Sequence, residues 1–113
     1  MNIIPDSHRD LLKDETRAFV FLATLMAGGS PQVTPVWFNT AGDAILANSA
    51  KGRVKEKNMQ FRPIVALCIQ DPTNPYRYLR VRGKVVEITM QGADAYIDML
   101  AGKYTGNFKY QQL

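Results

Sequence analysis

Residues 32–58 read QVTPVWFNTAGDAILANSAKGRVKEKN, a stretch that holds two strands, a tight turn and the start of a helix. Residues 32–38 are rich in β-branched and aromatic side chains and predict a strand. Pro35 cannot donate to a ladder, so this strand is expected to be irregular or to lie at an edge. A turn at residues 41–43 leads into a second strand at 44–48. Because tight turns join antiparallel strands, the stretch indicates an antiparallel sheet.

The sequence on either side adds strands of the same kind. A glycine turn at residues 27–30 joins residues 32–38 to a preceding strand. A later run is apolar on both faces, which is typical of a central strand. Further strands are predicted at residues 17–25, 64–70 and 76–89. Tight turns between most of them favour a mainly β fold, an antiparallel β-barrel with flanking helices, over a doubly wound sheet.

Three helices are expected beside these strands. The first spans residues 8–15, with Ser7 as its N-cap. The second spans residues 51–61 and is ended by Pro63. The third spans residues 91–101, stops at Gly102 and leaves a tail at 103–113. The residues expected to face inward are Leu11, Leu12, Val54, Asn58, Phe61, Val81, Val85, Ile88, Ala95, Ile97 and Met99.

The chain has 113 residues, which predicts a single domain over 1–113. Its net charge of +4 is concentrated in residues 51–62, which contain five basic side chains and one carboxylate. The charges of all other residues sum to zero. A diffuse basic surface would suggest nucleic acid. A neutral protein with one concentrated basic segment suggests a bound anion of limited size.

The expected location is cytoplasmic, with no membrane contact. The N-terminus has no basic start followed by an apolar block, so no signal peptide is expected. No apolar run reaches the ~18–20 residues of a membrane span. The single cysteine, Cys68, lies in an apolar run and is interpreted as a buried, inert thiol in a reduced compartment.

The strongest local signal is the junction at residues 48–57, where a strand ends in Asn-Ser and a basic helix begins. Cations at a helix N-terminus oppose the helix dipole, at about 0.3–1 kcal/mol each. An anion would offset this cost, because free N–H groups, the Ser49 hydroxyl and the basic side chains could together bind a phosphate. A solvated basic helix face is the alternative.

Two further segments could contact a ligand. Pro35 leaves backbone groups unpaired nearby, and these could bond the edge of a heterocycle beside Trp37. The alternative is an edge proline with a core tryptophan. Residues 74–78, NPYRY, alternate aromatic rings with an arginine and suit a planar ligand or a protein partner.

Side chains that carry chemistry by themselves are scarce. The one histidine, His8, is expected at the surface, and no Cys/His cluster predicts a metal site. Ser30 and Ser49 lack a plausible His/Asp set. If the protein is an enzyme, a cofactor must therefore supply the reactive group.

Three runs, in this order, carry a resemblance to a known family: QVTPVWF at residues 32–38, ILANSAKGRVKEKN at 45–58 and VALCIQDPTNPYRYLRVRGKV at 65–85. Together they resemble the FMN-binding split-barrel superfamily related to pyridoxamine 5′-phosphate oxidase. They are most similar to its deazaflavin (coenzyme F420)-dependent branch. The resemblance implies a six-stranded split barrel, a homodimer, and F420 or FMN at the subunit interface. The family's last C-terminal strand is expected to be missing here.

Site residues follow from the resemblance, position by position. The residues implied to line the ring, mainly through their backbone, are Gln32, Val33, Thr34, Pro35 and Val36. Those implied at the ring and ribityl side are Asn48, Ser49 and Ala50, and those implied to hold the phosphate are Lys51, Arg53 and Lys57. Tyr76, Arg77 and Tyr78 are implied to come from the neighbouring subunit.

The function expected is an oxidoreductase that transfers hydride between the (deaza)flavin and a small organic acceptor. The strand-to-helix junction differs from the phosphate motif of the oxidase itself, so oxidation of pyridoxamine phosphate is not expected. A non-catalytic binder of flavin, haem or a tetrapyrrole is the main alternative. Nucleic-acid binding is a third, which would require steep salt dependence.

Overall fold

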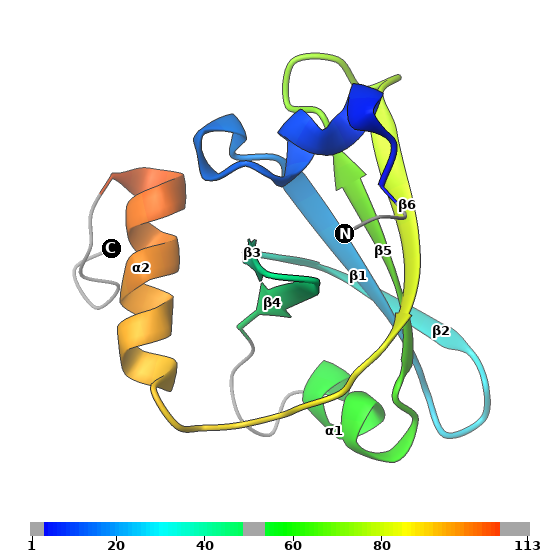
Figure 1. The fold of residues 1–113 in the computed structure, drawn as a ribbon. Helices are drawn as coiled ribbons and strands as arrows, with labels where there is room; N and C mark the ends of the chain where they lie inside the picture. The colour runs from blue at the N-terminus through cyan, green and yellow to red at the C-terminus, as the bar shows by residue number, and fades with distance from the viewer. Residues whose placement is uncertain (1–3, 49–53, 107–113) are drawn as a thin grey trace.

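The computed structural model describes residues 4–48 and 54–106, and its strands lie in two antiparallel sheets (Figure 1). Along the chain the elements are two 3₁₀ helices, η1 (Asp6–Leu12) and η2 (Asp14–Thr16), then β1 (Phe19–Leu25), β2 (Pro31–Val36), β3 (Phe38–Ala41), β4 (Ala44–Ala47), α1 (Val54–Phe61), β5 (Ile64–Gln70), β6 (Tyr78–Lys84) and α2 (Ala93–Thr105). The antiparallel, mainly β architecture with flanking helices is as predicted.

The larger sheet has the order β2-β1-β5-β6, so β5 is central as its apolar sequence predicted. Every neighbouring pair is antiparallel. Strand pairing puts alternate residues of each strand on a common face, and one of these faces is buried. It contributes Val20, Ile69 and Leu79 to a core that Leu11 of η1 and Phe38 of β3 complete.

The smaller sheet is the β3–β4 hairpin, which lies between the larger sheet and α2 (Figure 1). Three side chains of α2 bond this region: Tyr96, Lys103 and Tyr104. The helix therefore packs on the chain that leaves β2. No helix in the described ranges, 4–48 and 54–106, is long and apolar enough to cross a membrane.

The first helix differs from its prediction. It is a 3₁₀ helix that begins after Pro5, and Ser7 lies inside it rather than capping it. The Ser7 hydroxyl instead lies 2.7 Å from His8 Nδ1. A proline N-terminal to the first turn already sets an extended entry, so a side-chain cap at Ser7 was the wrong choice. Leu11 is fully buried, as expected.

The predicted strand at 32–38 is split at Trp37, and Phe38 starts β3. The reason lies in α2. Phe38 gives both its backbone groups to side chains of that helix, its N–H to Tyr104 and its carbonyl to Lys103. Those groups cannot also continue the β1–β2 ladder. Pro35 does lie on an edge strand, since β2 pairs only with β1 in the described part of the chain.

The predicted strand at 76–89 is shorter, and β6 ends at Lys84. The Val85 N–H still donates to the Pro63 carbonyl at 2.7 Å, in register with the β5–β6 ladder. Pro63 has no N–H to continue the pairing, and beyond this point the chain leaves the sheet toward α2 (Figure 1). Ile88 is consequently 44% exposed and is not a core residue.

The last helix is longer than predicted. It continues through the buried Gly102 and ends at Gly106, whose φ of 81° and N–H bond to the Gly102 carbonyl form a left-handed C-cap. Ala95 is exposed rather than inward. Lys103 and Tyr104, assigned to a tail from the sequence, are helical and packed against the core.

Candidate functional site

Strand β2 divides the five predicted ring-lining residues between two faces of the sheet. Gln32, Thr34 and Val36 are half-buried on the inner face, whereas Val33 and Pro35 are exposed on the outer face. A ligand on one side of the sheet can therefore touch only one of these sets with side chains. The inner set lies at i, i+2 and i+4 on the strand that is an edge in the described structure.

The inner face of β2 carries a polar atom with no partner. The Thr34 hydroxyl oxygen is buried and makes no hydrogen bond in the described structure. Two residues earlier, Gln32 Oε1 accepts a bond from the Thr24 hydroxyl at 3.3 Å. A buried hydroxyl without a partner costs about 1–3 kcal/mol, and such groups are few in folded proteins.

Helix α1 is docked on the sheet through polar contacts. Asn58 is 3% exposed, and its Nδ2 donates to the Thr24 hydroxyl at 3.0 Å. Its Oδ1 accepts from Arg62 Nη2 at 3.0 Å, and Arg62 Nε reaches the Leu25 carbonyl at 2.7 Å. The bonds from Gln32 through Thr24 and Asn58 to Arg62 form one chain, which we call the Asn58 network. It connects β2, β1 and α1.

Of the three residues of α1 that were expected to face inward, Val54, Asn58 and Phe61, the first and the last do not. Val54 is 45% exposed and Phe61 is 75% exposed, and only Asn58 between them is buried. Asn58 therefore docks the helix, because its side chain bonds the Thr24 hydroxyl on β1. The sequence predicted the helix, but apolar character did not identify the side chain that docks it.

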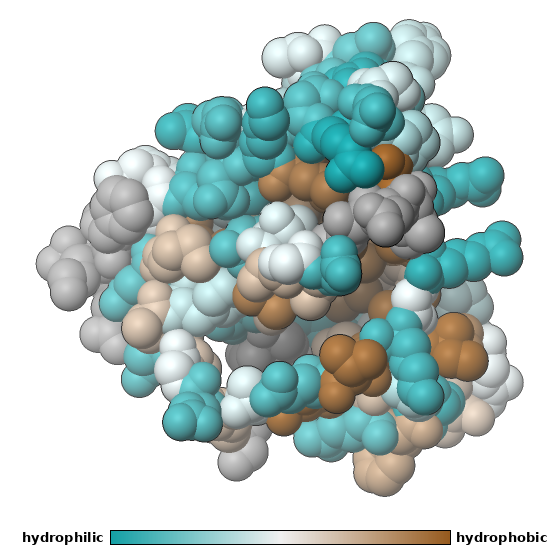
Figure 2. Space-filling view, viewed as in Figure 1, coloured by the Kyte–Doolittle hydropathy of each residue, from teal (hydrophilic) through white to brown (hydrophobic). Residues whose placement is uncertain are grey.

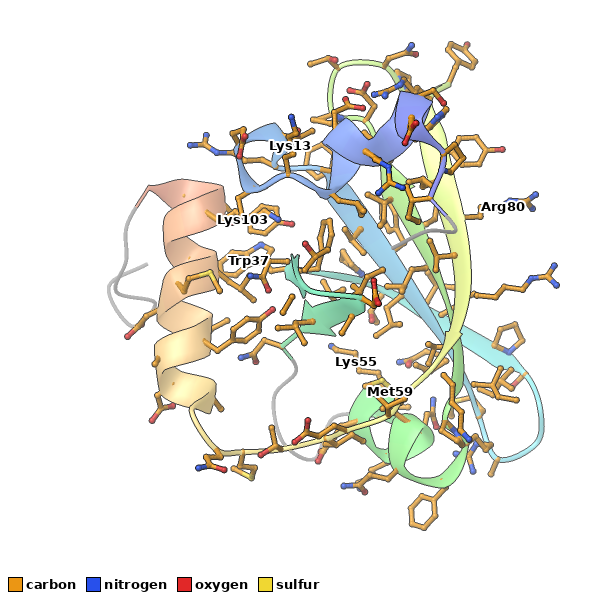
Figure 3. All side chains as sticks on the ribbon, viewed as in Figure 1. Lys13, Trp37, Lys55, Met59, Arg80 and Lys103 are labelled. Atoms are coloured by element: carbon orange, nitrogen blue, oxygen red, sulfur yellow. The ribbon has the colours of Figure 1, made fainter. Side chains whose placement is uncertain are left out.

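The structure describes only some of the residues predicted at the ribityl side and the phosphate of the cofactor. Ser49, Ala50, Lys51 and Arg53 lie outside the described residues. Asn48 is half-buried at the end of β4, and Lys57 is exposed on α1. Lys55 on the same helix is half-buried, and its side chain extends from α1 toward the interior side of the molecule (Figure 3). At least two cations of the basic segment thus belong to the helix that the Asn58 network fixes beside β2.

Residues 76–78 were predicted to reach the site of the neighbouring subunit together. In the structure Arg77 is bound differently from the two tyrosines. Its Nη1 lies 2.9 Å from Asp10 and 3.0 Å from Asp71, and its Nη2 bonds Asp10 and the Ser7 carbonyl. Bonds from the Thr73 N–H and hydroxyl, with Arg77, lower the pKa of Asp71 to about 2. Arg77 therefore ties η1 to the loop before β6 within its own chain. Tyr76 is 92% exposed and Tyr78 47%, so these two rings can meet another molecule.

A second cluster, which the sequence did not predict, lies where α2 meets the end of β2. Trp37 stacks on Tyr104 with ring centroids 5.4 Å apart and planes at 10°. Beside them the buried Lys103 pairs with Asp14 at 3.3 Å. Burial lowers the pKa of Lys103 and raises that of Tyr104 to about 12. The spacing of Tyr96, Leu100 and Tyr104, four residues apart, could have indicated that the helix continues past Gly102.

Comparison with known proteins identifies the family. The family described as Pyridoxamine 5'-phosphate oxidase matches residues 4–112, nearly the whole chain. The protein belongs to the pyridoxamine 5'-phosphate oxidase family. The resemblance of its three sequence runs to this split-barrel superfamily, and to the deazaflavin branch, is confirmed. No curated protein sequence matches the chain significantly.

Solved structures of the pyridoxamine 5'-phosphate oxidase fold agree with this assignment. An F420 reductase is 36% identical, with a TM-score of 0.81 over 89% of this chain and 79% of its own. HupZ from Group A Streptococcus is 16% identical, with a TM-score of 0.67 over 86% of this chain and 79% of its own. The conserved hypothetical protein Rv2991 from Mycobacterium tuberculosis is 18% identical, with a TM-score of 0.67 over 96% and 69%. The last two show the fold alone.

Within this family fold, the site offers binding groups rather than reactive ones. The described residues hold no cluster of three His, Cys, Asp or Glu side chains placed for a metal ion. The inner face of β2 offers a hydroxyl and an amide, and α1 offers ammonium groups. Such a set can orient a polar heterocycle and neutralise an attached phosphate.

Proposed function

We propose that this protein is an oxidoreductase that binds F420 or FMN and transfers hydride between the ring and a small organic acceptor. The main support for this proposal is the unpaired, buried Thr34 hydroxyl on β2. The chain is also 36% identical to an F420 reductase. The polar edge of a flavin or deazaflavin ring has donors and acceptors that a hydroxyl can bond. When bound, the ring would supply hydride transfer, which no described side chain can provide.

The chain's own residues would bind and orient this cofactor. Gln32 to Val36 and Asn48 to Ala50 are proposed at the ring and ribityl chain, and Lys51, Arg53 and Lys57 at the phosphate. The Asn58 network supports this arrangement because it holds β2 and α1 at a fixed distance from each other. A site of this kind accelerates the reaction by positioning two reactants, one of which is the cofactor.

Replacing Thr34 by valine tests the ring site, because the two consequences have opposite signs. The cofactor should bind about tenfold more weakly, as expected for the loss of one hydrogen bond of about 1.4 kcal/mol. The cofactor-free protein should become more stable by about 1 kcal/mol, since a buried unpaired hydroxyl is removed. Absorbance titrations with F420 and FMN and thermal unfolding measure both quantities.

Thr40→Val on β3 is the matched control, since it makes the same change on the other sheet and should leave cofactor affinity unchanged. Equal affinity in wild type and Thr34→Val would refute the ring site. Turnover separates the two function classes. A bound, reduced cofactor that no acceptor reoxidises would favour the alternative, a non-catalytic binder of flavin, haem or a tetrapyrrole.

The outer face of the larger sheet supports the proposal of a homodimer. It presents Phe19, Phe21, Val33 and Ile64 at 56%, 37%, 59% and 65% exposure. Hydrophobic residues also reach the surface in the lower half of Figure 2, among polar neighbours. These apolar residues lie on β1, β2 and β5, and β6 adds the exposed Arg80, Arg82 and Lys84 to the same face. An apolar patch with a polar margin is typical of an interface. Tyr76 and Tyr78, at the margin of this face, could then contact the partner's cofactor.

Replacing Phe21 by glutamate should therefore convert a dimer into a monomer. Phe21 stands opposite Pro35 and Cys68 on the two neighbouring strands, so an unpaired carboxylate there would face a desolvated surface. Its burial costs several kcal/mol, and we expect dimer dissociation to be at least about a hundredfold easier. Light scattering after gel filtration gives the solution mass. Val86→Glu, at an 86% exposed position outside the sheet, should stay dimeric; a monomeric wild type would contradict the proposal.

A further inference from the structure

The backbone of Phe38 is held from both sides by two residues in the last turn of α2. Its N–H donates to the Tyr104 hydroxyl at 3.4 Å, and its carbonyl accepts from Lys103 Nζ at 2.6 Å. The Tyr104 hydroxyl in turn donates to the Ala18 carbonyl at 3.3 Å, at the start of β1. Lys103 and Tyr104 are adjacent, and we call them the α2 clamp.

The α2 clamp buries a charge, which is costly. The Lys103 side chain is 2% exposed, and its only described carboxylate partner is Asp14 of η2. Its Nζ also lies 4.2 Å from the centre of the Phe38 ring and 5.0 Å from that of Tyr104. An apolar side chain could fill such a position at lower cost, so a buried ammonium indicates that a defined geometry is being held.

The α2 clamp holds the chain directly after β2, which is the proposed binding strand. Phe38 follows the last residue of β2 by two positions, and the intervening Trp37 stacks on Tyr104. In Figure 3, Trp37 and Lys103 lie next to each other between α2 and β3. Opening of the α2 clamp would remove two hydrogen bonds from the Phe38 backbone, next to the end of β2. Val36 would keep its pairing with Val20 of β1, but the support from α2 just beyond it would be lost.

We propose that Lys103 and Tyr104 are positioning residues that couple docking of α2 to ligand binding on β2. This inference rests on the proposed function, because the ligand is the F420 or FMN bound by β2. The coupling is reciprocal. If a docked α2 fixes β2 for the ligand, the bound ligand must stabilise α2 in its docked position by the same free energy.

Two variants of the full chain test this coupling. Tyr104→Phe keeps the ring on Trp37 and removes only the hydroxyl, and Lys103→Met keeps the length of the side chain and removes its charge. Each should raise the dissociation constant of F420 or FMN about tenfold, or about 1.4 kcal/mol. Tyr104→Phe is the milder change and keeps the test valid if Lys103→Met does not fold. The emission of Trp37, the chain's single tryptophan, should shift in cofactor-free Lys103→Met.

Hydrogen exchange separates coupling from a merely structural contact. Only coupling predicts that added cofactor changes the exchange rate of the α2 amides. In wild type, added cofactor should slow exchange of the amides of α2, and this protection should be lost in Tyr104→Phe. Tyr96→Phe is the matched control, because Tyr96 on the same helix bonds the Asn39 side chain at 2.7 Å and not the backbone at the end of β2. It should keep wild-type affinity and protection.

Each outcome bears on a different proposal. Normal cofactor binding without protection of α2, or unchanged affinity in both folded variants, would overturn the coupling alone. Failure of wild type to bind either F420 or FMN would overturn the proposed function and the coupling with it. Equal losses in Tyr96→Phe and Tyr104→Phe would show that general docking of α2, and not the α2 clamp, supports the site.

Discussion

Replacing Lys57 by alanine should weaken binding of F420 or FMN about ten- to hundredfold, the equivalent of losing one charge-assisted contact of about 1.5–3 kcal/mol. Lys57 is exposed on α1, and no carboxylate pairs with it in the described part of the chain. Its charge is therefore available to a ligand, and α1 is fixed beside β2. Arg53→Ala should act in the same direction, although Arg53 lies outside the described residues.

Riboflavin gives this prediction its sharpest control, because it has the ring of FMN without the phosphate. Lys57→Ala should lower the affinity for FMN and leave the affinity for riboflavin unchanged, as measured by fluorescence titration. Lys84→Ala, an exposed lysine on the edge of β6, should change neither. An equal loss for both ligands would mean that Lys57 acts on the ring or on folding, and the phosphate assignment would be wrong.

Much of the fold could be predicted because it is encoded in short segments. The apolar run of β5 identified the central strand, and the glycines at 28–29 and 42 identified the two hairpin turns. Gly29 and Gly42 have φ of 90° and 57°, a conformation that other residues rarely adopt. Pro35 likewise predicted an edge strand. In each case one residue's own chemistry determines the local structure.

The remaining features depend on contacts between distant segments. Asn58 meets Thr24, Lys103 meets Phe38, and Arg77 meets Asp10, across separations of 34, 65 and 67 residues. Each contact is a polar bond, to a side chain or to the Phe38 carbonyl, so no hydrophobic pattern predicts it. For the site, the sequence predicted the strand and the helix that carry it. It could not predict that Gln32 and Thr34 face one side, that Arg77 is bound within its own chain, or that α2 holds the end of β2.

The Asn58→Ala variant should lose about 1–3 kcal/mol of unfolding free energy, because one truncation leaves several buried groups without partners. The Thr24 hydroxyl and Arg62 Nη2 each lose a bond of 3.0 Å, and a cavity forms where Asn58 was 97% buried. Urea unfolding measures the loss. Gln60→Ala on the exposed side of the same helix should stay within about 0.5 kcal/mol of wild type.

The same variant should also weaken cofactor binding, although Asn58 is not expected to touch the cofactor. Without the Asn58 network, α1 is no longer fixed to Thr24, and through it to Gln32, so the ammonium of Lys57 loses its defined distance from the ring. Lys57→Ala should lower affinity at unchanged stability, whereas Asn58→Ala should lower both. Riboflavin separates the two again. Asn58→Ala should weaken the binding of riboflavin as well as of FMN, since Gln32 belongs to the Asn58 network. If riboflavin instead bound as tightly as to wild type, β2 would keep its position without α1.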